Sequence, residues 1–155
     1  MTRYDMNKIT KTDRKRLVDD VTAKSTSNLY DYAIMVCSPF RFNDLRKCFD
    51  RTPDDIDMML EMVSSEIEHY NNPVNIRTDK AINKMAKEVL MKDARAECVE
   101  IMSRCSVYRY DELVKYYKED KHNIFCMHLD LVKVELIHYG LMVMKHGDKF
   151  GNLCF

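Results

Sequence analysis

Four residues could form two acid–base or metal-binding pairs on predicted helices. Glu66 precedes His69 by three residues, and Glu135 precedes His138 with the same spacing. Residues three apart lie on one face of a helix, where a carboxylate and an imidazole can bind a metal or exchange a proton. The alternative is structural, since a histidine at a helix end is stabilised by the helix dipole and a nearby carboxylate. We favour the structural interpretation, because no glycine-rich phosphate loop, H-E-x-x-H motif or nucleophile elbow accompanies the pairs.

The cysteines are the other candidates for chemistry. They are Cys37, Cys48, Cys98, Cys105, Cys126 and Cys154. No two of them form a C-x-x-C pair, so a zinc site would have to be assembled from scattered Cys and His residues. The alternative is that they are small buried hydrophobic residues, which free cysteines usually are. We therefore predict no required metal, cofactor or disulfide, and no enzymatic activity.

An internal duplication relates many of these residues to one another. Residues 105–139 repeat residues 37–70, with Cys-Ser, Arg, Leu and Lys recurring first and Leu, Val, Glu and His-Tyr recurring after one inserted residue. Three phenylalanines of the first copy are replaced by tyrosines in the second. Two unrelated helices rarely share an apolar stripe and these polar residues in one order. We infer a true duplication, which determines the architecture better than it determines the function.

The spacing of apolar residues predicts the elements of each copy. The last helix of each copy has an apolar stripe with the spacing i, i+4, i+7, i+11. The stripes are Ile56, Leu60, Val63 and Ile67 in the first copy and Phe125, Leu129, Val132 and Leu136 in the second. Earlier in each copy, Phe-Arg-Phe at 40–42 and Tyr-Arg-Tyr at 108–110 alternate as short strands do. Asn43 and Asp111 would cap the helices that follow these strands.

Three further elements lie outside the two copies. A helix from about residue 12 to 24 would begin at Thr12 as its N-cap. A long helix over about 79–104 would join the copies and also form the first helix of the second one. After Tyr139, Gly140 suits the left-handed position that ends a helix. Residues 141–144 and 152–155 then predict a two-stranded hairpin.

This order of elements resembles a winged-helix domain. The resemblance is carried by Ile101-Met102, by Arg-Tyr-Asp-Glu-Leu at 109–113 and by Leu-Ile-His-Tyr-Gly-Leu-Met at 136–142. It covers about 95–155 directly and about 28–77 through the repeat. We therefore expect a mainly α fold with small β-hairpin wings, in which tandem winged-helix-like repeats are joined by a long helix.

The expected organisation has three parts. Residues 1–24 would form a basic N-terminal arm. Residues 25–77 would form the first winged-helix-like repeat, with a reduced wing. Residues 78–155 would contain the connecting helix and the second repeat.

The resemblance implies a surface for nucleic acid in the second copy, because winged-helix proteins place the third helix in the major groove and the wing on the backbone. The residues that would form it are Arg109, Lys121, His122, Asn123, Lys133, Lys145, His146 and Lys149. The basic arm and the connecting helix could add contacts. The net charge of the chain is zero, so we expect this binding to be weak.

The third helix of the first copy predicts a surface for protein instead. No Lys or Arg occurs from residue 53 to residue 76, and such a helix is repelled by phosphates. The candidate residues are Asp54, Asp55, Asp57, Met58, Glu61 and Met62. The methionines form a second apolar row, which could pack the two copies together, form a homodimer or bind another protein.

These observations predict a non-enzymatic regulatory protein. It would act on a transcription or nucleic-acid-processing assembly, mainly by protein contacts with auxiliary DNA contacts. One alternative is a sequence-specific, dimeric DNA-binding transcription regulator, and another is a small viral inhibitor of a host protein. No apolar run approaches the roughly 20 residues of a transmembrane helix, and no secretory signal is evident. We therefore expect a cytoplasmic, nuclear or host-intracellular location without membrane contact.

Overall fold

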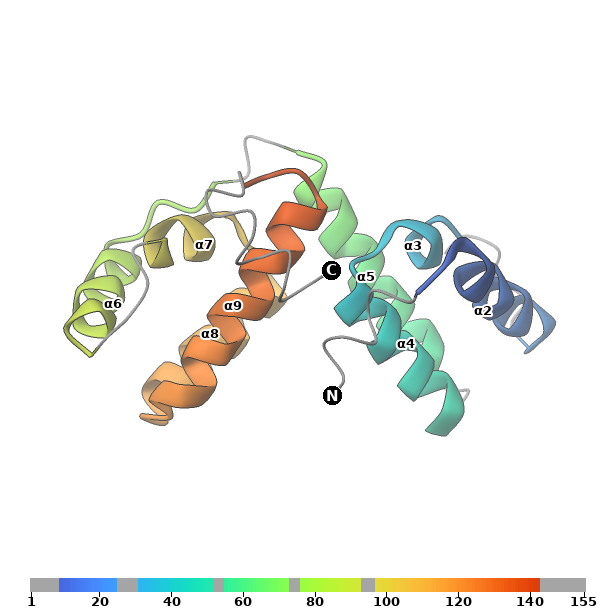
Figure 1. The fold of residues 1–155 in the computed structure, drawn as a ribbon, viewed down its shortest axis with the longest axis horizontal. Helices are drawn as coiled ribbons and strands as arrows, with labels where there is room; N and C mark the ends of the chain where they lie inside the picture. Colours follow the sequence, from blue (N-terminus) through green and yellow to red (C-terminus); the bar gives the residue numbers. More distant parts are fainter. Residues whose placement is uncertain (1–8, 25–30, 52–54, 73–75, 93–96, 143–155) are drawn as a thin grey trace. The chain divides into compact units, whose positions relative to one another are not determined.

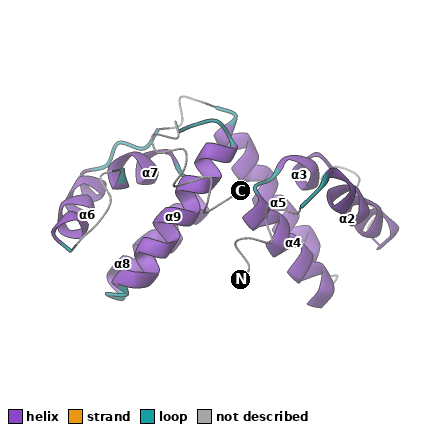
Figure 2. Ribbon diagram, in the orientation of Figure 1, coloured by secondary structure: helices purple, strands orange, loops and turns teal. Residues whose placement is uncertain are grey.

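The computed structural model describes residues 9–24, 31–51, 55–72, 76–92 and 97–142, and within these ranges every regular element is a helix (Figure 2). The helices are α2 (Lys11–Lys24), α3 (Asp31–Val36), α4 (Pro39–Arg51), α5 (Ile56–Tyr70), α6 (Lys80–Met91), α7 (Cys98–Arg104), α8 (Val107–Lys118) and α9 (His122–His138). The described chain divides into two compact units, with the boundary between Glu68 and His69. Figure 1 labels the helices of both units. Unit 1 contains α2, α3, α4 and most of α5, and unit 2 contains the end of α5 and α6 to α9.

The predicted winged-helix fold is wrong, because the described residues contain no strand and no sheet. Residues 40–42 lie in α4 and residues 108–110 lie in α8. An alternation over three residues does not distinguish a strand from the first turn of a helix. In the predicted hairpin, residues 141 and 142 are not in a strand, and residues 143–155 lie outside the described residues.

Serines begin the two helices that the sequence assigned partly to strands. The Ser106 hydroxyl accepts a hydrogen bond from the backbone N–H of Arg109 at 3.2 Å, and Ser38 does the same for Arg41 at 3.2 Å. Each serine thus satisfies one of the N–H groups that a helix start leaves without a partner. The predicted caps Asn43 and Asp111 are wrong, since both lie inside these helices.

The predicted long helix over 79–104 is also wrong, because α6 ends at Met91 and α7 begins at Cys98. Both helices bury apolar residues, among them Val89 in α6 and Cys98 in α7. These two residues would be about 2.5 turns apart in one continuous helix, and therefore on opposite faces. A break in the helix lets α6 and α7 pack against each other over one core.

Helix α2 belongs to the packed part of unit 1, since it contacts α3 and α4. It begins at Lys11 rather than Thr12, with reciprocal hydrogen bonds between Thr10 and Asp13 at 2.9 and 3.1 Å. These bonds resemble a capping box, with Asp13 in the place of the usual Glu, and they hold the pKa of Asp13 below its ordinary value. Buried Leu17 and Val21 have the same spacing as Met85 and Val89 of α6. Among the described helices, the duplication therefore extends to the pair α2 and α6.

The two apolar stripes are confirmed, because all eight of their residues are buried. The predicted end of the last helix is confirmed as well. Gly140 has a φ of 77°, and its N–H donates to the Ile137 carbonyl at 2.9 Å. The N–H of Leu141 donates to the Leu136 carbonyl at 2.8 Å, which completes a Schellman motif.

Candidate functional site

The duplicated glutamates of the predicted Glu–His pairs are bonded to arginines. In unit 1, both Glu66 oxygens accept hydrogen bonds from Arg41, at 2.7 and 3.1 Å. In unit 2, both Glu135 oxygens accept hydrogen bonds from Arg109, at 2.8 and 3.0 Å. All four side chains are buried, so these fork-shaped ion pairs lie in the two cores.

The histidines of the predicted pairs make other contacts. The His69 Nε2 atom lies 3.0 Å from the Arg104 carbonyl oxygen, and its ring meets the edge of Tyr70. His138 has the same edge contact with Tyr139, and within unit 2 the two tyrosine rings stack with centroids 4.5 Å apart. These contacts support the structural interpretation of the histidines.

A second arginine in each unit packs on a repeat-equivalent aromatic ring. Arg14 lies over the Phe42 ring at 5.3 Å and donates to the Ile34 carbonyl at 2.8 Å. Arg77 lies over the Tyr110 ring at 4.0 Å and donates at 3.3 Å to the carbonyl of Met102, the residue equivalent to Ile34. Arg14 is in α2, whereas Arg77 precedes α6, so non-equivalent positions supply the same contact.

The described residues of the predicted nucleic-acid set do not form one surface. Arg109 is in the buried pair, and Lys133 is buried against Glu97 with a distance of 3.0 Å between Nζ and Oε1. Lys121 and Asn123 are exposed near the start of α9, and His122 between them is half-buried. The other three residues, Lys145, His146 and Lys149, lie outside the described residues.

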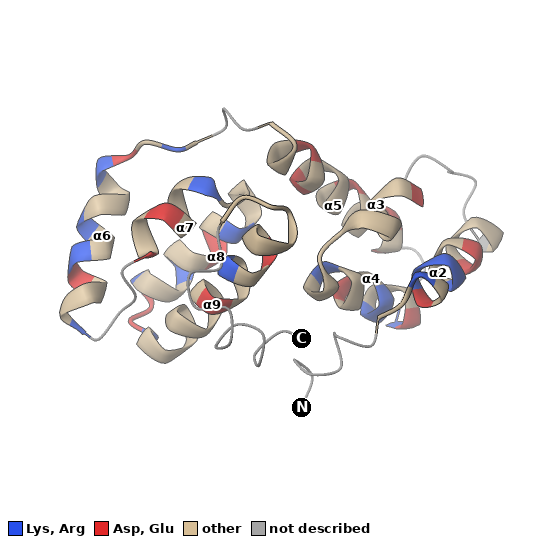
Figure 3. Cartoon of the chain, turned by 45° about the horizontal axis from the view of Figure 1, so that its top comes forward, with Lys and Arg blue, Asp and Glu red and all other residues tan. Residues whose placement is uncertain are grey.

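The structure shows a cationic surface on α6, of which the sequence predicted no individual residues. Lys80, Lys84 and Lys87 are exposed on the side of α6 opposite its buried residues. Figure 3 shows basic positions in blue along α6. Met91, which is 88% exposed, continues the same row. Their spacing of i, i+4, i+7, i+11 is visible in the sequence and could have identified them. We call Lys80, Lys84, Lys87 and Met91 the lysine face of α6.

The predicted protein-binding residues largely share one exposed face of α5. Asp57, Met58 and Glu61 are exposed, and Met62 is half-buried beside them. Asp55 is exposed immediately before the helix, and Asp54 lies outside the described residues. The opposite face of α5 carries the apolar stripe and the buried Glu66. We call Asp57, Met58, Glu61 and Met62 the acidic methionine face of α5.

The exposed methionine of this face has an equivalent in unit 2. Met58 is 74% exposed, and Met127 at the equivalent position of α9 is 68% exposed. Met62 and its equivalent Leu131 are both half-buried. Burying a methionine removes apolar surface from water, so exposure at both positions indicates a surface that is available for contact.

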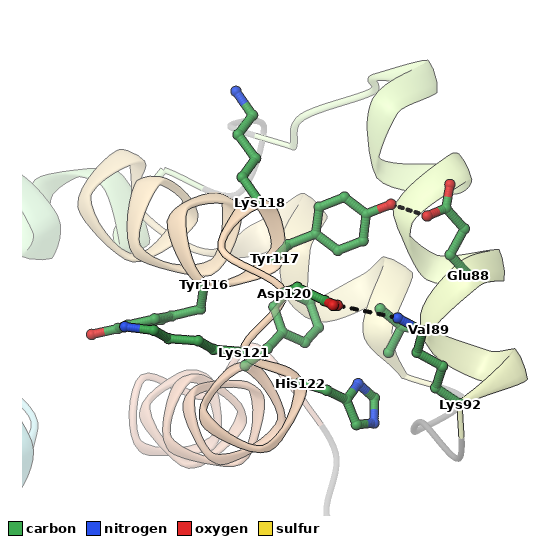
Figure 4. Close-up of a pocket in the computed structure, with 10 residues that line it drawn as sticks. Glu88, Val89, Lys92, Tyr116, Tyr117, Lys118, Asp120, Lys121 and His122 are labelled. Carbon is green, nitrogen blue, oxygen red and sulfur yellow. Dashed lines mark hydrogen bonds and ion pairs between the residues drawn. The ribbon is translucent and has the colours of Figure 1, made fainter.

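Unit 2 also contains a cavity of about 310 Å³ between α6 and the turn from α8 to α9 (Figure 4). Its lining residues are Glu88, Val89, Lys92, Tyr116, Tyr117, Lys118, Asp120, Lys121, His122 and Phe125. Tyr117 donates a hydrogen bond to Glu88, and this contact raises the pKa of the phenol. Lys92 and Asp120 form an ion pair at 3.4 Å. The first contact joins α6 to α8, and the second joins the residue after α6 to the turn after α8, so these side chains connect parts of unit 2.

The described cysteines are free thiols. Cys37, Cys98 and Cys105 are buried, as predicted for small hydrophobic residues, whereas Cys48 and Cys126 are half-buried. Burial raises the pKa of Cys98 to about 11 and that of Cys105 to about 12, so both are protonated at neutral pH. A protonated thiol is a poor nucleophile and a poor metal ligand. In the described ranges, no three His, Cys, Asp or Glu side chains are grouped closely enough to hold a metal.

Comparisons with models of known protein families, with curated proteins and with solved structures find no match to this chain. The helices in the described part of the chain all lack the combination of length and apolar content that spanning a membrane requires. In the described residues, the exposed faces of α5 and α6 are the candidate functional surfaces.

Proposed function

We propose that the protein is a non-enzymatic regulatory protein that binds another protein through the acidic methionine face of α5. The observation that carries this proposal is the exposure of Met58 between Asp57 and Glu61. Helix α5 has no Lys or Arg, and its opposite face is anchored in unit 1 by apolar packing and by the pair of Glu66 with Arg41. A rigid helix therefore presents an apolar anchor within a negatively charged surface.

The chemistry of this face favours a basic, amphipathic partner segment. Carboxylates attract and orient a segment rich in Lys and Arg, whereas the methionine side chains adapt to its apolar residues. Proteins of transcription and nucleic-acid-processing assemblies carry such segments to bind phosphates. A partner of that class supports a regulatory role in these assemblies and an intracellular location.

Auxiliary contacts with nucleic acid are a second candidate, and the lysine face of α6 supports them. Lys80, Lys84 and Lys87 could each neutralise a phosphate. Each such contact changes the log–log dependence of binding on salt by about −0.9. Exchanging all three lysines for Ala should therefore flatten the slope for duplex DNA by up to about three units. An unchanged slope would remove α6 from this role.

The α5 proposal can be tested by capturing partners from the extract of the source cell. The full chain would be compared with Asp57→Asn/Met58→Ser/Glu61→Gln, with and without nuclease. A matched control, Asp19→Asn/Asp20→Asn, removes exposed carboxylates from α2 of the same unit. We expect proteins that survive nuclease treatment to bind the wild type and the control and to be lost from the α5 variant. Equal capture by all three chains would overturn the proposal.

A further inference from the structure

The lysine face of α6 complements a row on α5 in both charge and spacing. The α5 row consists of Asp57, Glu61, Ser64 and Glu68, and the α6 row consists of Lys80, Lys84, Lys87 and Met91. Both rows have the spacing i, i+4, i+7, i+11, so each extends about 16 Å along its helix. The charged members of both rows are exposed. When the two helices run antiparallel, Glu61 faces Lys87 and Glu68 faces Lys80, so two such helix faces can bring opposite charges together over two turns.

Exposed apolar side chains border both rows. On α5 these are Met58 and the half-buried Met62, and on α6 they are Met91 and Leu90, which is 48% exposed. A nucleic-acid backbone offers phosphates for the lysines but no apolar partner for Leu90 and Met91. A protein helix that combines acids with methionines offers both. The apolar residues therefore favour a protein partner for α6 over nucleic acid.

The same chain carries both faces, and its net charge of zero leaves little overall repulsion between copies. We infer that two copies of this chain associate through the α5 row, which shares Asp57 and Glu61 with the acidic methionine face, in one copy and the lysine face of α6 in the other. This inference rests on the proposed function in one respect, because both use α5 as a protein-binding face. Self-association would then compete with the regulatory partner for that face.

The symmetry of this contact has a measurable consequence. The two faces differ, so the interface is heterologous, and each copy keeps one unused face after a pair has formed. Association can then continue into longer chains or close into a ring. Exposed ion pairs contribute little individually and are screened by salt, so we expect weak, salt-sensitive association.

Sedimentation velocity of the full chain over a range of concentrations tests this inference. The screening length falls from about 30 Å at 0.01 M salt to about 3 Å at 1 M. We expect the average mass of the wild type to rise at least about twofold with concentration at low salt and to remain that of a monomer at high salt. A monomer under all of these conditions would overturn the inference.

Two charge-reversal variants identify the faces. Asp57→Lys/Glu61→Lys reverses α5, and Lys84→Glu/Lys87→Glu reverses α6. Each variant alone should remain monomeric, and an equimolar mixture should regain association, because the mixture restores opposite charges at both contacts. Lys11→Glu/Lys15→Glu on α2 is the matched control and should associate like the wild type. Circular dichroism would confirm that each variant is folded, and a monomeric mixture would contradict the inference.

The same variants separate this inference from the proposed function. The α6 variant should lose self-association but keep the partners captured through α5. A monomeric wild type with α5-dependent capture would overturn the self-association and leave the proposed function standing. Self-association without α5-dependent capture would overturn the proposed function and leave the self-association standing. Loss of duplex DNA binding by the α6 variant, with a monomeric wild type, would assign the lysine face to nucleic acid.

Discussion

Units 1 and 2 hold their last helices with the same buried ion pair but differ in the surfaces that these helices expose. Arg41 pairs with Glu66 and Arg109 pairs with Glu135 in nearly identical geometry. Outside the core, α5 places Asp57 and Glu61 around its exposed methionine, whereas neither α9 equivalent, Cys126 or Asp130, is an exposed acid. Buried pairs tolerate little change because a lone buried charge is costly, whereas exposed residues can diverge. The proposed protein-binding role of α5 rests on this difference.

The second arginine of each unit shows that a contact can be retained while its source changes. Arg14 of α2 and Arg77 before α6 both pack on the aromatic residue that follows the paired arginine. The position equivalent to Arg14 is the buried Ile82. A long flexible side chain can reach one site from two backbone positions, provided that the aromatic ring and the carbonyl remain in place.

We expect the largest effect on stability from substitutions that break the buried ion pairs. Glu66→Ala and Glu135→Ala should each lower the free energy of unfolding by about 3–5 kcal/mol, because each removes the buried carboxylate and leaves the arginine with its more exposed partner, Asp44 for Arg41 and Glu112 for Arg109. Chemical denaturation measures the loss, and hydrogen exchange shows which unit is affected. Arg109→Met/Glu135→Leu is the control and should cost much less than Glu135→Ala. A small effect in one unit alone would mean that the two pairs are not equivalent.

The apolar stripes should give the next largest effect. Leu60→Ala and Leu129→Ala each remove a fully buried side chain, so each should cost about 2–5 kcal/mol. Exposed Met58→Ala and Met127→Ala serve as matched controls on the same helices, and we expect them to change the midpoint of a denaturant melt little. A melt that is unchanged by either leucine substitution would contradict burial of that stripe.

Substitution of the second arginines, Arg14 and Arg77, should affect the stability of the two units differently, because the burial of these side chains differs. Arg14 is buried and donates at 2.8 Å, whereas Arg77 is half-buried and donates at 3.3 Å. We expect Arg14→Ala to cost about 1.5–3 kcal/mol, the range for a hydrogen bond to a charged group, and Arg77→Ala to cost less. Denaturant melts of the two variants measure this order. The reverse order would show that the contacts are not analogous.

The smallest effect concerns acid stability and is confined to unit 2. Burial holds the pKa of His128 below its ordinary value of 6.5, so the unfolded chain binds this proton more tightly than the folded chain. The contribution of His128 to stability is therefore complete above pH 6.5 and is lost as the pH falls through the interval below it.

His128→Met, which introduces the residue of the equivalent position 59, should reduce this acid-dependent loss. Thermal melts over a pH series compare the variant with the wild type. The charges of Glu112, Arg109 and Glu135 also act on the pKa of His128. The two carboxylates remain in the variant, so we expect its stability to keep some dependence on acid pH. An identical pH profile for both chains would exclude His128 as its cause.

Local patterns were reliable where one helix or one turn carries the information. The apolar stripes and the helix end at Gly140 depend on neighbouring residues, and the structure confirms both. The strand prediction at 40–42 failed because three alternating residues also fit the first turn of a helix that begins after Ser38. A longer alternation would have been needed to distinguish the two.

The sequence by itself determined the duplication and the inward faces of the last helices, since these follow from identities and from the helical period. Only the tertiary structure decided that Arg109 pairs with Glu135, 26 residues away, instead of facing a ligand. It also decided that α6 and α7 are separate helices, because their apolar faces reach one core only across a break. The free energy of burying a charged side chain depends on partners that are distant in the chain. An arginine with such a partner can therefore be buried, whereas a lysine of the same charge without one stays exposed.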